Sequence, residues 1–379
     1  MRIRYLGCLL LAALGSVGQA VGDEPRSFRA LDLDAALAPA ALAERLSSKR
    51  VVFVGETHNR YADHLNQLEV IRQIHARDPD IAIGVEYLQR RFQPKVDDYI
   101  AGRTTEREFL RATQYYDGWG YDYRLYAPIF RFAREHHIPV RALNVPPSLP
   151  SAVAKVGLKG LTAEQRAELP QQIEPASDAY KAMLRDAFGA HGAAERGRFD
   201  RFVEAQLVWD EGMAASAAEY LDANPGRRMV ILTGSGHLVF GYGIPERLER
   251  RTGASYGIVL NTDREIEPGM ADYVLLAEEQ DLPPAGTLGI RMEEADGGAR
   301  VVLFAPGSAA EKSGVEKDDV LTAIDGEPVA SVADVRLALW DKKPGDSVNV
   351  EVRRRHRRKN QDLAFHVALA APHAAAAHP

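Results

Sequence analysis

Arg50-Val-Val-Phe-Val-Gly-Glu-Thr-His58 is the stretch of sequence that decides the fold. Its four apolar residues, three of them β-branched, run into Gly55, and an apolar run of this length is typical of a strand that is buried on both faces. Glycine lets the backbone turn sharply, so Glu56 and His58 follow the carboxyl end of the strand, where open α/β sheets bind ligands. The alternative is a strand that ends in a turn with two solvated polar residues.

The same pattern, an apolar run followed by a polar residue, recurs along the chain. Further strands are predicted at 81–87, 139–144, 228–233 and 256–260, with helices at 61–77, 94–112, 126–133 and 199–221. This alternation predicts an α/β fold, with a mostly parallel sheet flanked by helices. Glu86, Asn144 and His237 follow three of the strands, so we expect them to converge with Glu56 and His58 on one cleft.

Two carboxylates and two imidazoles in one cleft permit two kinds of site. Glu56, His58, Glu86 and His237 could hold a divalent metal, because carboxylate oxygen and neutral imidazole are its usual ligands. Alternatively they are catalytic, with His58 as a general base tuned by Glu56 or Glu86. No HExxH spacing is present, and Gly234-Ser-Gly-His237 does not match the GxSxG motif of a nucleophilic serine. Whether the protein is an enzyme stays open at this point.

A dense group of aromatic residues lies between the second and third predicted strands. It comprises Tyr115, Tyr116, Trp119, Tyr121, Tyr123 and Tyr126. One interpretation is a cluster at the edge of the core, with buried rings and satisfied hydroxyls. The other is a wall for a flat aromatic ligand, with a tyrosinate available to ferric iron.

The N-terminus has the features of a secretory signal. Met1-Arg-Ile-Arg4 is basic, Leu6–Leu14 is apolar, and Gly18-Gln-Ala20 fits a cleavage site, which predicts a signal peptide over 1–20 and a protein of the periplasm or outer envelope. Lipidation would need Cys8, the one cysteine, but almost no hydrophobic region precedes it, so we expect soluble export. The net charge of −6 gives no general case for a nucleic-acid partner.

Several blocks in order resemble the ChaN family, a group of haem-binding, iron-regulated proteins of Gram-negative bacteria that is similar to the Tiki, TraB and erythromycin esterase proteins. The blocks include Gly55-Glu-Thr-His58, His64-x-x-Gln67, Gly84-Val-Glu86-Tyr87, Trp119-Gly-Tyr-Asp-Tyr123, Ala142-Leu-Asn144 and Gly234-Ser-Gly-His237-x-x-x-Gly241-Tyr-Gly-Ile-Pro245. The resemblance covers about 45–260.

This resemblance implies two functions. The first is haem binding in haem or iron handling, with a tyrosine on the iron and two haems paired across a homodimer. The resemblance does not single out the tyrosine, so Tyr87, Tyr116 and Tyr242 are candidates, together with His64. The second function is a periplasmic hydrolase, with or without a metal, in which Glu56, His58, Glu86 and His237 form the active centre.

The C-terminal part resembles a PDZ domain of the bacterial periplasmic-protease type. The resemblance rests on Thr287-Leu-Gly-Ile290, Val301-Val-Leu-Phe-Ala-Pro306 and Gly314-Val-x-x-Asp318-Asp-Val-Leu321-x-x-Ile324-Asp325-Gly326. In this fold Leu288, Gly289 and Ile290 would offer backbone N–H groups to a carboxylate, and the adjacent strand edge would add a peptide or a protein C-terminus as another strand. The alternative is a domain that packs only on its own chain.

The expected domain boundaries follow from these segments. They are a signal peptide at 1–20, the ChaN-like α/β domain at 21–280, the PDZ domain at 284–370 and a low-complexity, disordered tail at 371–379. A basic run, Arg353-Arg-Arg-His-Arg-Arg-Lys359, is expected to form a solvated hairpin tip. The alternative is contact with the anionic lipid of the outer membrane or envelope.

Overall fold

A computed structural model describes residues 36–189, 196–261, 266–276, 278–356 and 359–372 of the protein. The chain divides into two units, Met1–Ala38 and Pro39–Pro379, and both described sheets belong to the second unit. The predicted signal peptide and residues 373–379 of the predicted tail lie outside the described residues. No described helix combines the length and the apolar character needed to span a membrane.

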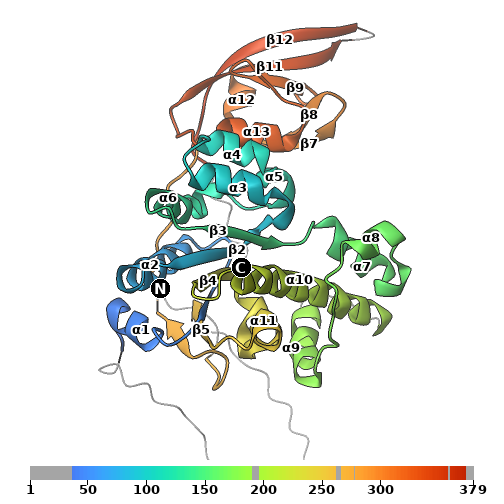
Figure 1. The fold of residues 1–379 in the computed structure, drawn as a ribbon. Helices are drawn as coiled ribbons and strands as arrows, with labels where there is room; N and C mark the ends of the chain where they lie inside the picture. The colour runs from blue at the N-terminus through green and yellow to red at the C-terminus, as the bar shows by residue number, and fades with distance from the viewer. Residues whose placement is uncertain (1–35, 190–195, 262–265, 277, 357–358, 373–379) are drawn as a thin grey trace, which may run out of the picture. The chain divides into compact units, whose positions relative to one another are not determined.

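The first sheet is parallel throughout its described strands, in the order β3-β2-β4-β1-β5-β6 (Figure 1). The α/β prediction is confirmed, and the apolar run after Arg50 forms β1, between β4 and β5. The five predicted strands are present, and a short sixth strand was not predicted. The bounds are β1 (Val51–Glu56), β2 (Ile81–Gln89), β3 (Val140–Asn144), β4 (Arg228–Gly234), β5 (Tyr256–Asn261) and β6 (Tyr273–Leu275).

Helices cover both faces of this sheet, because alternate residues of a strand point to opposite sides. Val52 and Val54 pack in a core with α2, α3 and α6, whereas Val51 and Phe53 pack in another core with α10 and α11. Full burial of each such side chain stabilises the fold by about 1.5–3 kcal/mol. The helices of this part are α1 (Pro39–Arg45), α2 (Tyr61–Arg77), α3 (Gln93–Ile100), α4 (Glu106–Ala112), α5 (Tyr115–Gly118), α6 (Ala127–Glu135), α7 (Ser148–Val156), α8 (Ala163–Ala167), α9 (Asp178–Gly189), α10 (Arg196–Ala223) and α11 (Ile244–Thr252), and the 3₁₀ turns are η2 (Arg90–Phe92), η3 (Tyr123–Leu125), η4 (Leu158–Gly160), η5 (Ser235–His237) and η6 (Val239–Gly241).

The helix predicted over 94–112 is two helices, α3 and α4. Gly102 follows α3 with a φ of 75°, a left-handed conformation that glycine adopts without strain. Thr105 then begins α4 with a capping box, in which its hydroxyl accepts from the Glu108 N–H and the Glu108 carboxylate accepts from the Thr105 N–H. The prediction of one helix was wrong because Gly102 ends the first helix and the Thr105 capping box begins a second.

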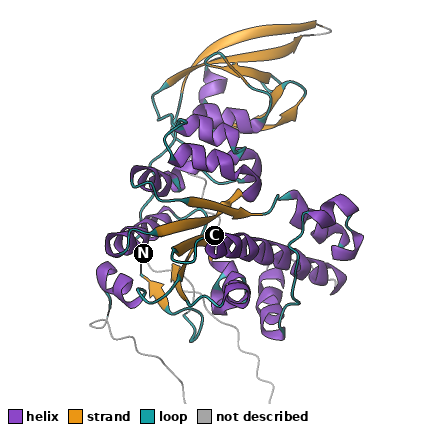
Figure 2. Ribbon diagram, viewed as in Figure 1, coloured by secondary structure: helices purple, strands orange, loops and turns teal. Residues whose placement is uncertain are grey.

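The second sheet is antiparallel, in the order β12-β11-β9-β8-β7, with β10 paired to β9 (Figure 2). Its core includes Val301, Leu321 and Val350. Strand β7 forms one edge of the sheet, which leaves one side of its backbone without a neighbouring strand. The elements are β7 (Ile290–Ala295), β8 (Gly298–Phe304), α12 (Ala309–Lys312), β9 (Val320–Ile324), β10 (Glu327–Pro328), α13 (Val332–Leu339), β11 (Ser347–His356) and β12 (Lys359–Ala368).

Candidate functional site

Glu56 and His58 form an ion pair at the carboxyl end of β1. Nδ1 of His58 lies 2.5 Å from Oε1 of Glu56, whose side chain is only 2% exposed. Burial alone would lower the pKa of His58, but the Glu56 and Glu86 carboxylates outweigh it and raise this pKa above its ordinary value. The His58 side chain is 27% exposed, so its ring is the part of the pair that a ligand can reach.

Glu86 and His237 form a second ion pair beside the first. Nε2 of His237 lies 3.4 Å from Oε1 of Glu86, and Oε2 of Glu86 accepts a 2.7 Å hydrogen bond from the Gly234 N–H. Burial alone would raise the pKa of Glu86, but His237, His58 and this N–H lower it to about 2. Burial alone would lower the pKa of His237, but Glu86 and Asp210 raise it to about 10. His237 is therefore protonated near neutral pH.

Asp210, which lies within the helix predicted over 199–221, is a further member of this cluster, and the sequence alone gives it no role. It lies in α10, is fully buried, and its Oδ1 accepts a 2.7 Å hydrogen bond from Nδ1 of His237. Its Oδ2 accepts a 2.5 Å hydrogen bond from the hydroxyl of Tyr180 in α9. The signal that could have found it is a charged residue among apolar ones on a buried helix, because such a residue needs a partner.

Of the residues predicted to converge, the structure brings Glu56, His58, Glu86 and His237 together. Asn144 is buried at the end of β3, but its Oδ1 has no hydrogen-bond partner among the described residues. Oε2 of Glu56 and the hydroxyl of Tyr87 are also buried without a hydrogen-bond partner among the described residues, although Nε2 of His64 lies 3.7 Å from this Glu56 oxygen. Burial raises the pKa of Tyr87, and the carboxylates of Glu56 and Glu86 raise it further, so its hydroxyl is held neutral close to both. Such orphaned polar atoms are typical of a site that takes a ligand or ordered water.

A divalent metal fits this cluster only in part. Glu56, His58 and Glu86 each offer one ligand atom, and these three atoms lie within 4.8 Å of one another. They could form part of a coordination shell. His237 would be the fourth ligand, but a ring protonated between Glu86 and Asp210 has no lone pair to give. Two imidazoles face three carboxylates in this cluster, those of Glu56, Glu86 and Asp210.

The aromatic group divides between the core and the surroundings of His58. Tyr115, Tyr123 and Tyr126 are buried in the core. Trp119 is half-buried and Tyr121 is 37% exposed, and the ring centroid of each lies 4.9 Å from that of His58. The Trp119 and Tyr121 rings are 5.5 Å apart, so these two rings and that of His58 lie in contact with one another.

The four residues predicted to bind a cofactor lie in different surroundings. Tyr87 and His64 are buried, with His64 held between Oε1 of Gln67 and the carbonyl oxygen of His58, at 3.2 Å from each. Tyr116 is half-buried against Tyr115, and burial raises its pKa. Tyr242 is half-buried and stacks on Phe240 at 5.5 Å. Their roles stay predictions.

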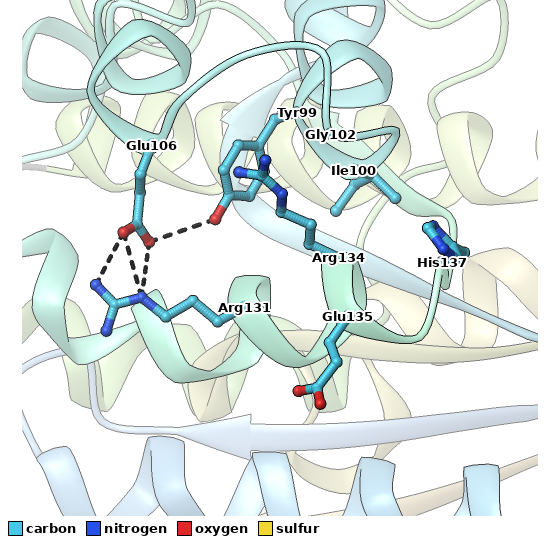
Figure 3. Close-up of a pocket in the computed structure, with 8 residues that line it drawn as sticks. All are labelled: Tyr99, Ile100, Gly102, Glu106, Arg131, Arg134, Glu135 and His137. Carbon is cyan, nitrogen blue, oxygen red and sulfur yellow. Dashed lines mark hydrogen bonds and ion pairs between the residues drawn. The ribbon is translucent and has the colours of Figure 1, made fainter.

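A separate hollow of about 490 Å³ lies among α3, α4 and α6, away from these residues (Figure 3). Its Glu106 accepts hydrogen bonds from Arg131, at 2.8 Å, and from the hydroxyl of Tyr99, at 3.4 Å. The guanidinium of Arg134 lies 4.9 Å from the centre of the Tyr99 ring. These groups satisfy one another, and we assign the hollow a structural role in joining the three helices.

The three residues predicted to bind a peptide lie at the start of β7. Leu288, Gly289 and Ile290 line a groove of about 560 Å³ together with Val335 and Leu339 of α13. In the basic hairpin formed by β11 and β12, Arg354 is already bonded to Asp319 and Glu316, while residues 357–358 lie outside the description. The predicted solvated tip and its alternative, contact with anionic lipid, both stay untested.

Comparison with known sequences finds two families on this chain. A family described as "Haem-binding uptake, Tiki superfamily, ChaN" matches residues 42–248, and the PDZ domain family matches residues 286–368. The periplasmic pH-dependent serine endoprotease DegQ of Escherichia coli (strain K12) is 26% identical over 121 residues, which are 32% of this chain and 25% of DegQ. The chain thus spans about a quarter of the length of that relative.

Comparison with solved structures agrees with the fold. A structure of ChaN of Campylobacter jejuni with cofacially bound haem is 17% identical, with a TM-score of 0.52, over 62% of this chain and 91% of that one. The PDZ domain of HtrA3 with a phage-derived ligand is 25% identical, with a TM-score of 0.20, over 23% of this chain and 86% of that one. At this identity the first likeness concerns the fold alone.

Proposed function

Because the chain belongs to the ChaN family of haem-binding uptake proteins in the Tiki superfamily and also carries a PDZ domain, we propose that it is an exported haem-binding protein that acts in haem or iron acquisition. It would work in the periplasm or outer envelope of a Gram-negative bacterium, as the expected signal peptide indicates. The PDZ domain would bind a peptide or the C-terminus of a partner protein.

The observation that carries this proposal is the exposed ring of Tyr121 beside His58 and Trp119. A haem is flat and largely apolar, so it fits against rings of this kind, and its ferric iron accepts a tyrosinate ligand. Tyr87 and Tyr116 are poor candidates for the tyrosinate ligand, because burial raises the pKa of both hydroxyls and so disfavours their ionised form. We therefore place the haem at Tyr121, with Trp119 and His58 along its face.

Titration of hemin into the protein without residues 1–20 tests the proposal. We expect saturable binding at micromolar concentration, with a shifted Soret band, and a doubled mass in solution if two haems pair across a dimer. Tyr273→Phe, which removes a hydroxyl from β6 outside the cleft, is the matched control and should bind hemin as the wild type does. No change in the Soret band at equimolar hemin would contradict the proposal.

A hydrolase is the second candidate function, and the arrangement of His58 favours it. Its Nδ1 is held by Glu56, while its Nε2 has no hydrogen-bond partner in the part of the chain that the structure describes. An imidazole oriented by a carboxylate on one nitrogen, with the other nitrogen exposed, is suited to take a proton from water. Glu86 and protonated His237 would then face the substrate with one negative and one positive group.

The two functions make different predictions for the same variants. A hydrolase would lose turnover in both His58→Ala and His237→Ala, while a thermal melt shows that the fold is kept. A haem carrier without hydrolase activity would bind hemin and show no turnover of ester substrates in the wild type. Screening the wild type against a panel of aryl and lactone esters decides whether the second candidate survives.

A further inference from the structure

Residues of the α/β domain form one wall of the peptide groove of the PDZ domain. Residues Pro39–Pro379 form one compact unit, and the groove between β7 and α13 is also lined by Tyr116, Gly120, Tyr121 and Asp122, which we call the aromatic segment. These residues come from α5 and the turn after it, more than 160 positions earlier in the chain.

Several contacts hold the PDZ domain against this part of the α/β domain. Arg107 of α4 forms an ion pair of 3.2 Å with Asp341 and donates to the carbonyl oxygen of Leu337 at 3.3 Å. The ring of Trp340 meets the ring of Tyr123 edge-on at 5.6 Å. Arg111 also pairs with Glu327. These contacts fix the α/β domain against α13, the residues that follow it and β10.

The backbone at the head of the groove is ready for a carboxylate. The N–H groups of Leu288 and Gly289 donate to no acceptor within the described residues, and Gly289 has a φ of 69°. Successive free N–H groups in such a turn form a concave anion site. Because β7 is an edge strand, an extended peptide can add to it next to this site.

The charges that line the groove indicate which peptide it takes. Arg291 on β7 and Arg336 on α13 form no ion pair among the described residues. Asp122, the acidic residue of the aromatic segment, does not neutralise these two arginines, because its carboxylate forms an ion pair of 2.6 Å with Arg124. Two uncompensated cations favour acidic residues in the peptide, and Leu288, Val335 and Leu339 offer an apolar surface to its last side chain.

The aromatic segment also reaches the cleft of the α/β domain. Tyr121 lines the peptide groove, and its ring lies 4.9 Å from the ring of His58. A single exposed side chain therefore stands between the two binding sites. Any ligand that moves or fixes this ring at one site changes what the other site can contact.

We propose that the groove is a composite site, in which a peptide with a free C-terminal carboxylate and acidic residues before it lies between the PDZ domain and the aromatic segment. Because Tyr121 serves both sites, occupancy of the groove opposes ligand binding at the His58 end of the cleft. The inference rests on the proposed function only where the cleft ligand is taken to be haem.

Fluorescence anisotropy on the chain without residues 1–20 tests the composite wall. The probe is fluorescein-labelled Gly-Gly-Asp-Glu-Val-Val with a free carboxylate, and its C-terminal amide is the first control. We expect the amide to bind about tenfold more weakly and Tyr121→Ala to weaken the acid at least fivefold. Val156→Ala, at an exposed position on α7 away from the groove, is the second control and should bind the acid as the wild type does.

Two outcomes overturn the composite site. One is equal affinity for the acid and the amide, or no binding of either. The other is a peptide affinity of folded Tyr121→Ala within twofold of the wild type, which would show that the aromatic segment is not part of the site.

Repeating the titration in saturating hemin tests the coupling. Coupling between two sites is reciprocal and commonly amounts to a change of about 5–150-fold in affinity. We expect hemin to weaken the peptide at least fivefold and the peptide to weaken hemin by the same factor. A shift below twofold, with both ligands bound, overturns the coupling. If hemin does not bind at all, the proposed function fails. The peptide affinity of Tyr121→Ala still shows whether the aromatic segment is part of the groove.

Discussion

Oδ1 of Asp210 lies 2.7 Å from Nδ1 of His237, and this contact joins a helix covering the sheet to the turn after β4. With Glu86 on the other ring nitrogen, His237 is held between two carboxylates that are both buried. The cluster therefore has a buried positive group, His237, and a more exposed imidazole, His58.

Replacing Asp210 with asparagine should lower the pKa of His237 and destabilise the protein. The change removes the charge that raises this pKa and leaves the Tyr180 hydroxyl facing an amide, at a cost of about 1–3 kcal/mol. A histidine NMR titration, with the His237→Gln spectrum to assign the signal, measures the first effect. Tyr180→Phe is the control that removes one hydrogen bond and keeps the charge. An unchanged His237 pKa would refute the role given to Asp210.

The stability of the protein should fall in alkaline solution. The pKa of His237 is raised from 6.5 to about 10, so its contribution is complete below pH 6.5 and is lost as the pH rises through about 10. Glu86 behaves in the opposite sense, since its pKa is lowered from 4.5 to about 2, and its contribution is lost as the pH falls through about 2. Urea unfolding should show a loss of up to about 3 kcal/mol between pH 6.5 and 9. The slope should be smaller in His237→Gln, and equal slopes would contradict the assignment.

Glycine at position 234 keeps the His58 ring in place. A Cβ at this position would lie 2.7 Å from Cε1 of His58, whereas a Cβ at Gly236 would meet nothing within 4 Å. Gly234 has an ordinary φ of −57°, so alanine there causes no backbone strain. We expect Gly234→Ala to displace the His58 ring, to change the emission of neighbouring Trp119 and to weaken hemin binding, with the fold kept. Gly236→Ala should do none of these, and matching effects in both variants would argue against a positional role for Gly234.

Glu211 should be among the most costly residues to remove. Its fully buried carboxylate forms ion pairs with Arg247, Arg250 and Arg251, at 3.4 Å, 2.6 Å and 2.5 Å. Loss of one partner from a buried network leaves uncompensated charge, which costs about 3–5 kcal/mol. The free energy of unfolding in urea should therefore fall by several kcal/mol in Glu211→Ala. It should hardly change in Glu246→Ala, at an exposed position on α11. Equal stability of the two variants would contradict this account.

The first sheet could be predicted from the sequence because its strands are buried on both faces. β1, β2 and β4 are almost continuous apolar runs, and a run of this kind has few alternatives once glycine and polar residues bound it. β6 has three half-buried residues and pairs only with β5, so it leaves no such pattern. Helix 94–112 was predicted without its break because a charged segment does not by itself reveal a left-handed glycine such as Gly102.

Of the residues at this site, the sequence predicts only those at or directly after the end of a strand. Glu56, His58, Glu86 and His237 share the carboxyl edge of one parallel sheet, so topology alone brings them together. Asp210 and Tyr180 reach the cleft from helices, and no rule of strand order places them there. The division of the aromatic group was likewise open, because the sequence does not say that Tyr123 faces the core while Tyr121 faces His58.

The most direct test of the central claim is the Soret spectrum of hemin titrated into the wild type and into Tyr121→Phe. The account predicts that the wild type binds hemin with the high-spin spectrum of a tyrosinate ligand, and that this spectrum is lost in Tyr121→Phe but kept in Tyr273→Phe. An identical spectrum and affinity in Tyr121→Phe would contradict the placement of haem at the mouth of the cleft.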